Sequence, residues 1–360
     1  PTIIVLIEAT STEIAGRRAK DVTRQRDADD VAAHQEANRA FAAAGAVMVG
    51  ATVAVVENHD GLEDMAGVLT WLSTQSNGFK NQLATSGTVL FRGFPVKTAE
   101  DFDAFASAFG YGDFSYQESL SNAVRINHTT RVFSANEASP DIEIFLHHEL
   151  AQTPISPEKI FFCCLSEAEK GGATPVCRSD LLYATFRERH PDWARLFASL
   201  GLKYTMHMPG EDDPSSGQGR SWRSTLSVET ETEAQERLAA LGYTWQWQED
   251  GSLVTRTPVL PAVKALPDGS ESFYNQLIAA HLGWKSTGSG KSEMLTFGNG
   301  DAIPIASLTA LASIAAEFTV PVMWQNGDVA LVDNHRVMHG RYPYSGSRKR
   351  TVIVCFAREK

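Results

Sequence analysis

The stretch FLHHELAQTP, Phe145 to Pro154, constrains the fold most, because it places two histidines and a glutamate directly after an apolar run. Such groups are costly to remove from water unless something pairs with them. In a β-strand, side chains two positions apart lie on one face, so we expect His147 and Glu149 to point together into the interior while His148 points elsewhere. A metal ion would satisfy both. On spacing alone, a solvated strand face explains such a pair more often.

A third ligand would come from near the C-terminus, where VDNHRVMHGRYPY carries His335 and His339. The two histidines share strand parity, so periodicity does not choose between them. Two histidines and one carboxylate form the facial triad of non-haem iron(II) oxygenases, which leaves positions open for cosubstrate and oxygen. Arg350 follows His339 by eleven positions and begins an apolar strand. Its planar fork suits a dicarboxylate bound beside the metal.

The composition narrows the class of protein. The 360 residues are 43% hydrophobic and 21% charged, as in an ordinary soluble protein. The net charge of −11 argues against a general nucleic-acid binder, which needs a basic face. No stretch approaches the roughly 18 apolar residues of a membrane span. The four cysteines include no C-x-x-C pair, which favours buried thiols in a reducing cytoplasm. The oligomeric state cannot be read from the sequence.

The pattern of short strands predicts an α+β protein with a mainly β core, a double-stranded β-helix or jelly roll flanked by helices. Residues 1–60 form an N-terminal extension of unknown role, helical over 12–44. Residues 61–360 form one domain, with helical insertions at about 180–300. Strands are expected at 88–95, 159–166, 202–209, 320–341 and 349–357, and a hairpin around Asp250-Gly251. Helices are expected at 98–110, capped by Thr98, at 180–201, capped by Asp180, and at 234–242.

Three segments together resemble a known family. They are FLHHELAQTP, FFCCLSEAEKGGATPV and WQNGDVALVDNHRVMHGRYPYSGSRKR. The chain from about Thr88 to its C-terminus resembles the taurine dioxygenase superfamily, and within it the clavaminate synthase-like iron(II)/2-oxoglutarate dioxygenases. The first 60 or so residues carry no resemblance.

The resemblance implies roles for individual residues. His147, Glu149 and His339 would ligate iron(II), and Arg350 and Thr174 would hold the distal carboxylate of 2-oxoglutarate. The enzyme would use oxygen to oxidise an unactivated C–H bond of a small polar substrate, an amino acid or a derivative in specialised metabolism. Succinate and carbon dioxide would be released, and hydroxylation, desaturation and ring closure stay open. Asn127, Gln152 and Asn275 are candidate substrate residues, although each is as readily explained as a loop hydrogen bond.

Two alternatives remain at this point. One is a cupin-like metal enzyme, an isomerase, lyase or ring-cleaving enzyme that does not use 2-oxoglutarate. The other is a non-catalytic metal-binding scaffold. Arg350 and Thr174 speak against the first, because such an enzyme needs no dicarboxylate clamp. Succinate formation coupled to oxygen uptake would exclude the second.

Overall fold

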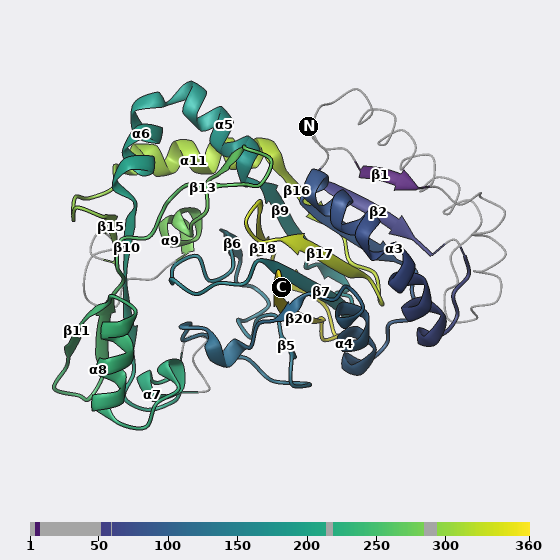
Figure 1. The fold of residues 1–360 in the computed structure, drawn as a ribbon, viewed down its shortest axis with the longest axis horizontal. Coiled ribbons are helices and arrows are strands. Elements are labelled where there is room, and N and C mark those ends of the chain that lie inside the picture. The colour runs from purple at the N-terminus through teal and green to yellow at the C-terminus, as the bar shows by residue number, and fades with distance from the viewer. Residues whose placement is uncertain (1–3, 8–51, 59, 214–218, 284–293) are drawn as a thin grey trace.

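The chain folds into layers of helices and sheets, shown in Figure 1. The computed structural model describes residues 4–7, 52–58, 60–213, 219–283 and 294–360. Two β-sheets face each other at the centre, and helices cover their outer faces. The helix predicted over 12–44 lies outside the described residues.

The larger sheet has eight described strands, in the order β1-β2-β3-β17-β7-β20-β4, with β5 also paired to β20. β1 and β2 run parallel to their neighbours, whereas the other pairs are antiparallel. Both described ends of the N-terminal extension are therefore strands of this sheet. The strand bounds are β1 Ile4–Ile7, β2 Val53–Glu57, β3 Thr88–Arg92, β4 Gly112–Asp113, β5 Val132–Ser134, β7 Lys159–Ser166, β17 Val329–Asp333 and β20 Thr351–Arg358.

The smaller sheet faces the larger one and has four described strands in the order β16-β9-β18-β6, all antiparallel. Its strands are β6 Ile144–His147, β9 Thr174–Arg178, β16 Thr319–Val322 and β18 Val337–Arg341. The candidate ligand residues His147 and His339 lie in this sheet, at its β6–β18 edge.

The sequence of β7 explains the layering. Ile160, Phe162 and Cys164 lie in the core between the two sheets. Phe161 and Cys163 alternate with them and lie in the core on the other face, under helices. Because both faces of the strand are covered, it reads as a continuous apolar run rather than an alternating one. This strand was predicted with its observed bounds.

Two helices cover the larger sheet, α3 (Met65–Ser86) and α4 (Ala99–Ser107). Thr98 and Asp101 form a capping box at the start of α4, which confirms the predicted cap. Helix α3 was not predicted. It ends at Gly87, whose φ of 81° suits glycine, and a Cβ there would lie 2.4 Å from the side chain of Val337. Glycine therefore lets α3 end directly against β18.

The smaller sheet is covered by α5 (Ser179–Arg189), α6 (Pro191–Leu200), α9 (Leu277–Gly283) and α11 (Ile305–Phe318). The single helix predicted over 180–201 is wrong. The chain leaves helical geometry at His190, because a following proline disfavours the α conformation. Asp180 is not the cap either. It is buried and accepts hydrogen bonds from Arg178 and Arg336, the latter at 2.7 Å.

The region 180–300, predicted as helical insertions, contains strands as well. A third sheet has the described order β11-β12-β10-β15, with β10 Leu202–Met208, β11 Thr244–Trp247, β12 Leu253–Arg256 and β15 Leu295–Phe297. Helices α7 (Trp222–Leu226) and α8 (Glu231–Ala240) pack beside it. Two short ladders pair β13 Lys264–Ala265 with β14 Glu271–Ser272 and β8 Lys170–Gly171 with β19 Tyr344–Ser345, and a 3-10 helix, η1, spans Tyr116–Glu118.

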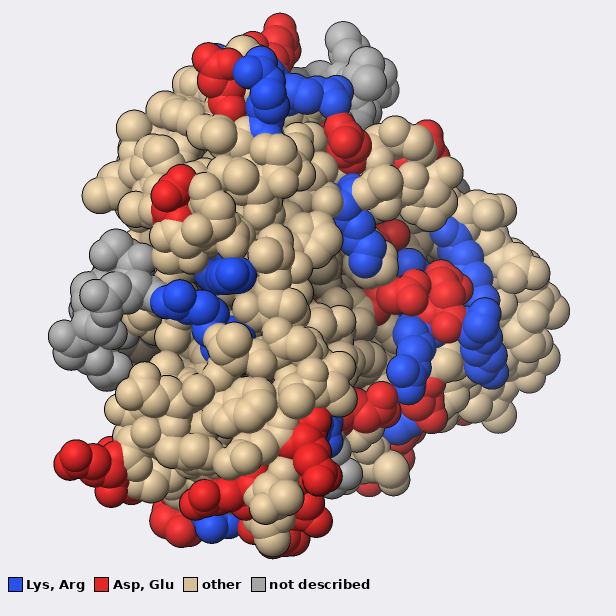
Figure 2. Space-filling model, turned by 60° about the vertical axis from the view of Figure 1, so that its left-hand side comes forward, with Lys and Arg blue, Asp and Glu red and all other residues tan. Residues whose placement is uncertain are grey.

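Two features concern possible partners. Within the described ranges, none of the helices has the length and apolar character to cross a bilayer. On the face seen in Figure 2, the described lysine and arginine side chains form small groups, several of them beside acidic ones, rather than one continuous basic stripe. The expectation against nucleic-acid binding stays a prediction.

We expect Asp180→Ala to destabilise the fold by about 3–5 kcal/mol, because it removes a buried carboxylate that two buried arginines share. Arg178 and Arg336 both contact this carboxylate. Urea unfolding followed by circular dichroism measures the effect. The control is Asp192→Ala, whose side chain is 86% exposed in a pair with Arg195. That change should stay within about 0.5 kcal/mol of the parent. Equal effects would contradict a stabilising role for the buried cluster.

Candidate metal centre

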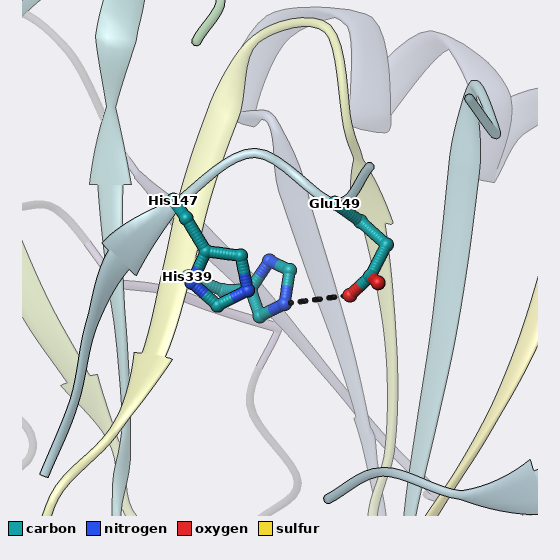
Figure 3. A group of neighbouring side chains, drawn as sticks. All are labelled: His147, Glu149 and His339. Carbon is teal, nitrogen blue, oxygen red and sulfur yellow. Dashed lines mark ion pairs between the residues drawn. The ribbon is translucent and has the colours of Figure 1, made fainter. Parts of the chain in front are cut away.

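Three side chains from two segments that are distant in the sequence meet at the edge of the smaller sheet. His147 is the last residue of β6, Glu149 lies in the turn that follows, and His339 is in the middle of β18. One donor atom from each lies within 4.8 Å of the other two, and Nε2 of His339 is 3.5 Å from Oε2 of Glu149. Figure 3 shows the two imidazole rings and the carboxylate converging on one small space. Among the described residues, this group alone has metal-ligand geometry.

Strand pairing brings the two histidines together. β6 and β18 are antiparallel, and His147 lies directly opposite His339. The next residue, Gly340, allows the strands to approach, because a Cβ there would lie 2.4 Å from the carbonyl oxygen of Ile144. The close packing of β18 against β6 thus explains why the HGR motif has glycine at position 340. The ring centroids of the two histidines are 4.5 Å apart.

Glu149 reaches the site by a different route from the one predicted. β6 ends at His147, so the two residues do not share a strand face and that expectation is wrong. The chain instead turns at Leu150, which adopts a left-handed φ of 58°, uncommon for a non-glycine residue. Asn334 holds this turn. Its Oδ1 accepts from the Glu149 N–H at 2.8 Å, and its Nδ2 donates to the Glu149 carbonyl at 3.0 Å.

The buried groups have the protonation states that a metal requires. Burial, together with the nearby His339, lowers the pKa of His147 to about 4. Burial alone would raise the pKa of Glu149, but the Arg125 guanidinium and the nearby histidines outweigh it and lower that pKa to about 2. At neutral pH the imidazole is therefore neutral and the carboxylate ionised. Both forms can donate electron pairs to a cation.

The hydrogen bonds of the histidines also fit a metal. Nδ1 of His147 donates to the carbonyl of Phe145 at 2.8 Å, which leaves Nε2 as the ligand atom. Nδ1 of His339 is buried and has no hydrogen-bond partner in the described part of the chain. With two imidazoles and one carboxylate on one side of the space, the donor set suits non-haem iron(II).

A cavity of about 60 Å³ adjoins these ligands, and both predicted cosubstrate residues line it. Arg350 donates from Nε to the carbonyl of Gly172 at 2.9 Å, which fixes its side chain. Burial lowers the pKa of Arg350 to about 10, so it is still charged at neutral pH. Oγ1 of Thr174 accepts from Trp324 Nε1 at 2.9 Å and so has its hydroxyl proton to offer. A cation and a hydroxyl donor thus lie in one cavity with the candidate ligands.

The other histidines of the motifs lie outside the group. His335 accepts from Nζ of Lys264 at 2.9 Å. His148 is fully buried, and its Nδ1 donates to the carbonyl of Asn334 at 2.5 Å. The structure therefore separates His339 from His335, which periodicity could not do.

The three candidate substrate residues have different surroundings. Asn127 lines a second, larger cavity of about 450 Å³. Gln152 is buried and lines neither cavity. Asn275 bonds to the backbone of other segments. Its side-chain Nδ2 donates to the carbonyl oxygen of Ala262, and its backbone carbonyl oxygen accepts from the N–H of His148. Gln152 and Asn275 therefore do not line the cavity beside the candidate metal ligands.

Sequence reasoning missed Arg125. Its Nη2 lies 2.9 Å from Oε1 of Glu149, and both side chains are buried. Arg125 also lines both cavities. It lies in an irregular segment 22 positions before His147 and belongs to no motif, so no signal in the sequence marks it.

A group of two histidines and one carboxylate, here at the β6–β18 edge of the smaller sheet, is typical of non-haem iron(II) oxygenases. The family model described as "Taurine catabolism dioxygenase TauD, TfdA family" matches residues 59–356. The chain therefore belongs to this family. It is a 2-oxoglutarate-dependent oxygenase that uses iron(II), a small-molecule substrate and oxygen, and the two alternatives left open by the sequence are not retained.

Curated relatives agree with this assignment. The chain is 36% identical to the clavaminate synthase-like protein At3g21360 of Arabidopsis thaliana over 285 residues, which are 79% of this chain and 86% of that protein. It is 26% identical to the dapdiamide synthesis protein DdaC of Enterobacter agglomerans over 280 residues, 74% of this chain and 81% of that protein. The predicted resemblance to the clavaminate synthase-like branch is confirmed.

A shorter match has a different character. An adenylate kinase of Methanocaldococcus jannaschii is 49% identical over 69 residues, which are 18% of this chain and 36% of the kinase. A match over so small a share of both chains assigns no kinase activity.

We expect His339→Ala to abolish high-affinity metal binding, because it removes one of the three candidate ligands. His335→Ala is the matched control, since His335 bonds to Lys264 and should leave binding unchanged. Equilibrium titration of the metal-free protein with Mn(II) measures both. Loss of Mn(II) in the control but not in His339→Ala would contradict the ligand assignment.

Proposed function

We propose that His147, Glu149 and His339 hold the iron(II) and that Arg350 and Thr174 bind the distal carboxylate of 2-oxoglutarate. The enzyme oxidises an unactivated C–H bond of a small polar molecule, an amino acid or a derivative, by hydroxylation or by desaturation or ring closure. Succinate and carbon dioxide are the coproducts. The observation that carries this proposal is the convergence of the three donor atoms beside a cavity that holds a cation and a hydroxyl.

Each group of the chain has a defined task in this proposal. When bound, iron(II) supplies the oxidising chemistry together with 2-oxoglutarate and oxygen. Arg350 and Thr174 orient the cosubstrate, and Trp324 fixes the Thr174 hydroxyl by donating to it. Burial of Glu149 and His339, with His147 half-buried beside them, keeps bulk water from the reacting atoms.

We assign the substrate to the larger cavity. Its volume of about 450 Å³ lies within the usual range for small-molecule sites. Its lining includes Asn127, Arg220 and Thr130. Arg125 belongs to the walls of both cavities and so links this space to the metal ligands. The names of two relatives refer to clavaminate and to dapdiamide, which is in keeping with a small polar substrate.

Two further proposals complete this description. The two facing sheets form the predicted jelly roll, which their shared core supports. The protein works in a reducing cytoplasm, in keeping with four buried free cysteines.

Anaerobic addition of iron(II) and 2-oxoglutarate tests the proposed function. A weak visible charge-transfer band should form, and admitting oxygen should release succinate. Amino acids and their derivatives are then screened for those that perturb the band and stimulate oxygen uptake. Absence of both the band and succinate would contradict the proposed centre.

We expect Arg350→Ala to raise the KM for 2-oxoglutarate about a hundredfold, because losing one partner of a buried charge pair costs about 2–5 kcal/mol. Metal binding should persist, since Arg350 is not a ligand. The control is Arg348→Ala, whose half-exposed side chain lies 3.9 Å from Glu167. Succinate formation, measured at several concentrations of 2-oxoglutarate, gives the KM of each variant. An unchanged KM in Arg350→Ala would overturn the assignment of this clamp.

A further inference from the structure

Arg125 is a buried cation held by aromatic rings and by backbone carbonyl oxygens. Its guanidinium carbon lies 5.0, 5.4 and 5.5 Å from the ring centroids of Tyr116, Phe133 and Phe356. Its Nη1 donates to the carbonyl oxygens of Ser134, at 3.2 Å, and Ala135, at 2.6 Å. These contacts fix both the plane and the direction of the guanidinium.

The fixed guanidinium of Arg125 donates a hydrogen bond to only one of the two carboxylate oxygens of Glu149. Nη2 of Arg125 donates to Oε1 at 2.9 Å. The other oxygen, Oε2, is the one that lies 3.5 Å from Nε2 of His339, among the candidate ligand atoms. One carboxylate oxygen is therefore held by the protein, and the other faces the metal space (Figure 3).

We propose that Arg125 is a positioning residue that limits Glu149 to binding the metal through one oxygen. This inference rests on the proposed metal centre. Carboxylates bind cations through one oxygen or through two. Octahedral iron with a facial triad keeps about three open positions, of which the 2-oxoglutarate chelate takes two and oxygen the last. A carboxylate bound through both oxygens would leave no position for oxygen once the chelate is formed.

A simpler explanation is that Arg125 only neutralises the negative charge of the buried Glu149 carboxylate. Charge balance alone would not need the cage around the guanidinium. A lysine would supply the same charge as a single flexible group, without the two bonds to Ser134 and Ala135. Arg125→Lys and Arg125→Met therefore separate the two explanations, since the first keeps the charge and both lose the fixed fork.

The test counts the water molecules on bound Mn(II) by the relaxation of water protons. The metal-free protein is titrated to saturation with Mn(II), so that the readout does not depend on turnover. The parent should hold about three exchangeable waters and keep about one after 2-oxoglutarate is added. Both variants should hold about one water fewer, and none after 2-oxoglutarate. The control is Arg131→Gln, on the same segment, which removes a partner of Asp103 and should match the parent.

Outcomes are distinct for the two proposals. If either Arg125 variant binds Mn(II) and keeps the water count of the parent, the positioning role is overturned. If one variant fails to fold, the other decides. If the parent itself binds no Mn(II), or binds it with a number of waters incompatible with three protein ligands, the proposed metal centre fails instead.

Discussion

The pairing of β6 with β18 is the contact on which the functional part of the molecule depends. It places His147 opposite His339, although 192 positions separate them in the chain. The close approach requires glycine at position 340, where a side chain would strike the backbone of β6. The packed core between the two sheets holds this edge in place. The placement of the two histidines thus follows from ordinary strand pairing, whereas Glu149 is placed by the turn that Asn334 holds.

Around this edge, several buried polar groups are paired with one another. Asn334 satisfies both backbone groups of Glu149, and Arg125 satisfies one oxygen of its carboxylate. Trp324 does the same for Thr174. An unpaired group at these positions would carry its full desolvation cost. Nδ1 of His339 is a buried atom without a partner in the described part of the chain, and it lies at the site itself, where a ligand or water is expected.

Much of the local structure could be predicted, because its signals are local. The apolar run of β7 and the Thr98–Asp101 box of α4 gave the correct elements. The break at His190 was also readable from Pro191, but the helix signal on both sides concealed it. Helix α3 was missed, because its serines, threonines and two glycines lower its helix propensity, and tertiary packing overrides that weak propensity.

The sequence by itself determined the chemistry of the ligand set, because an imidazole and a carboxylate two positions apart, followed by a second histidine and a late arginine, resemble one family of enzymes. Only the tertiary structure separated the two histidines of the same strand parity, since His335 contacts Lys264 whereas His339 lies beside His147 and Glu149. The tertiary structure also brings Arg125 to the carboxylate of Glu149 and Asn334 to its backbone. Such contacts depend on how distant segments pack, and side-chain periodicity carries no information about that.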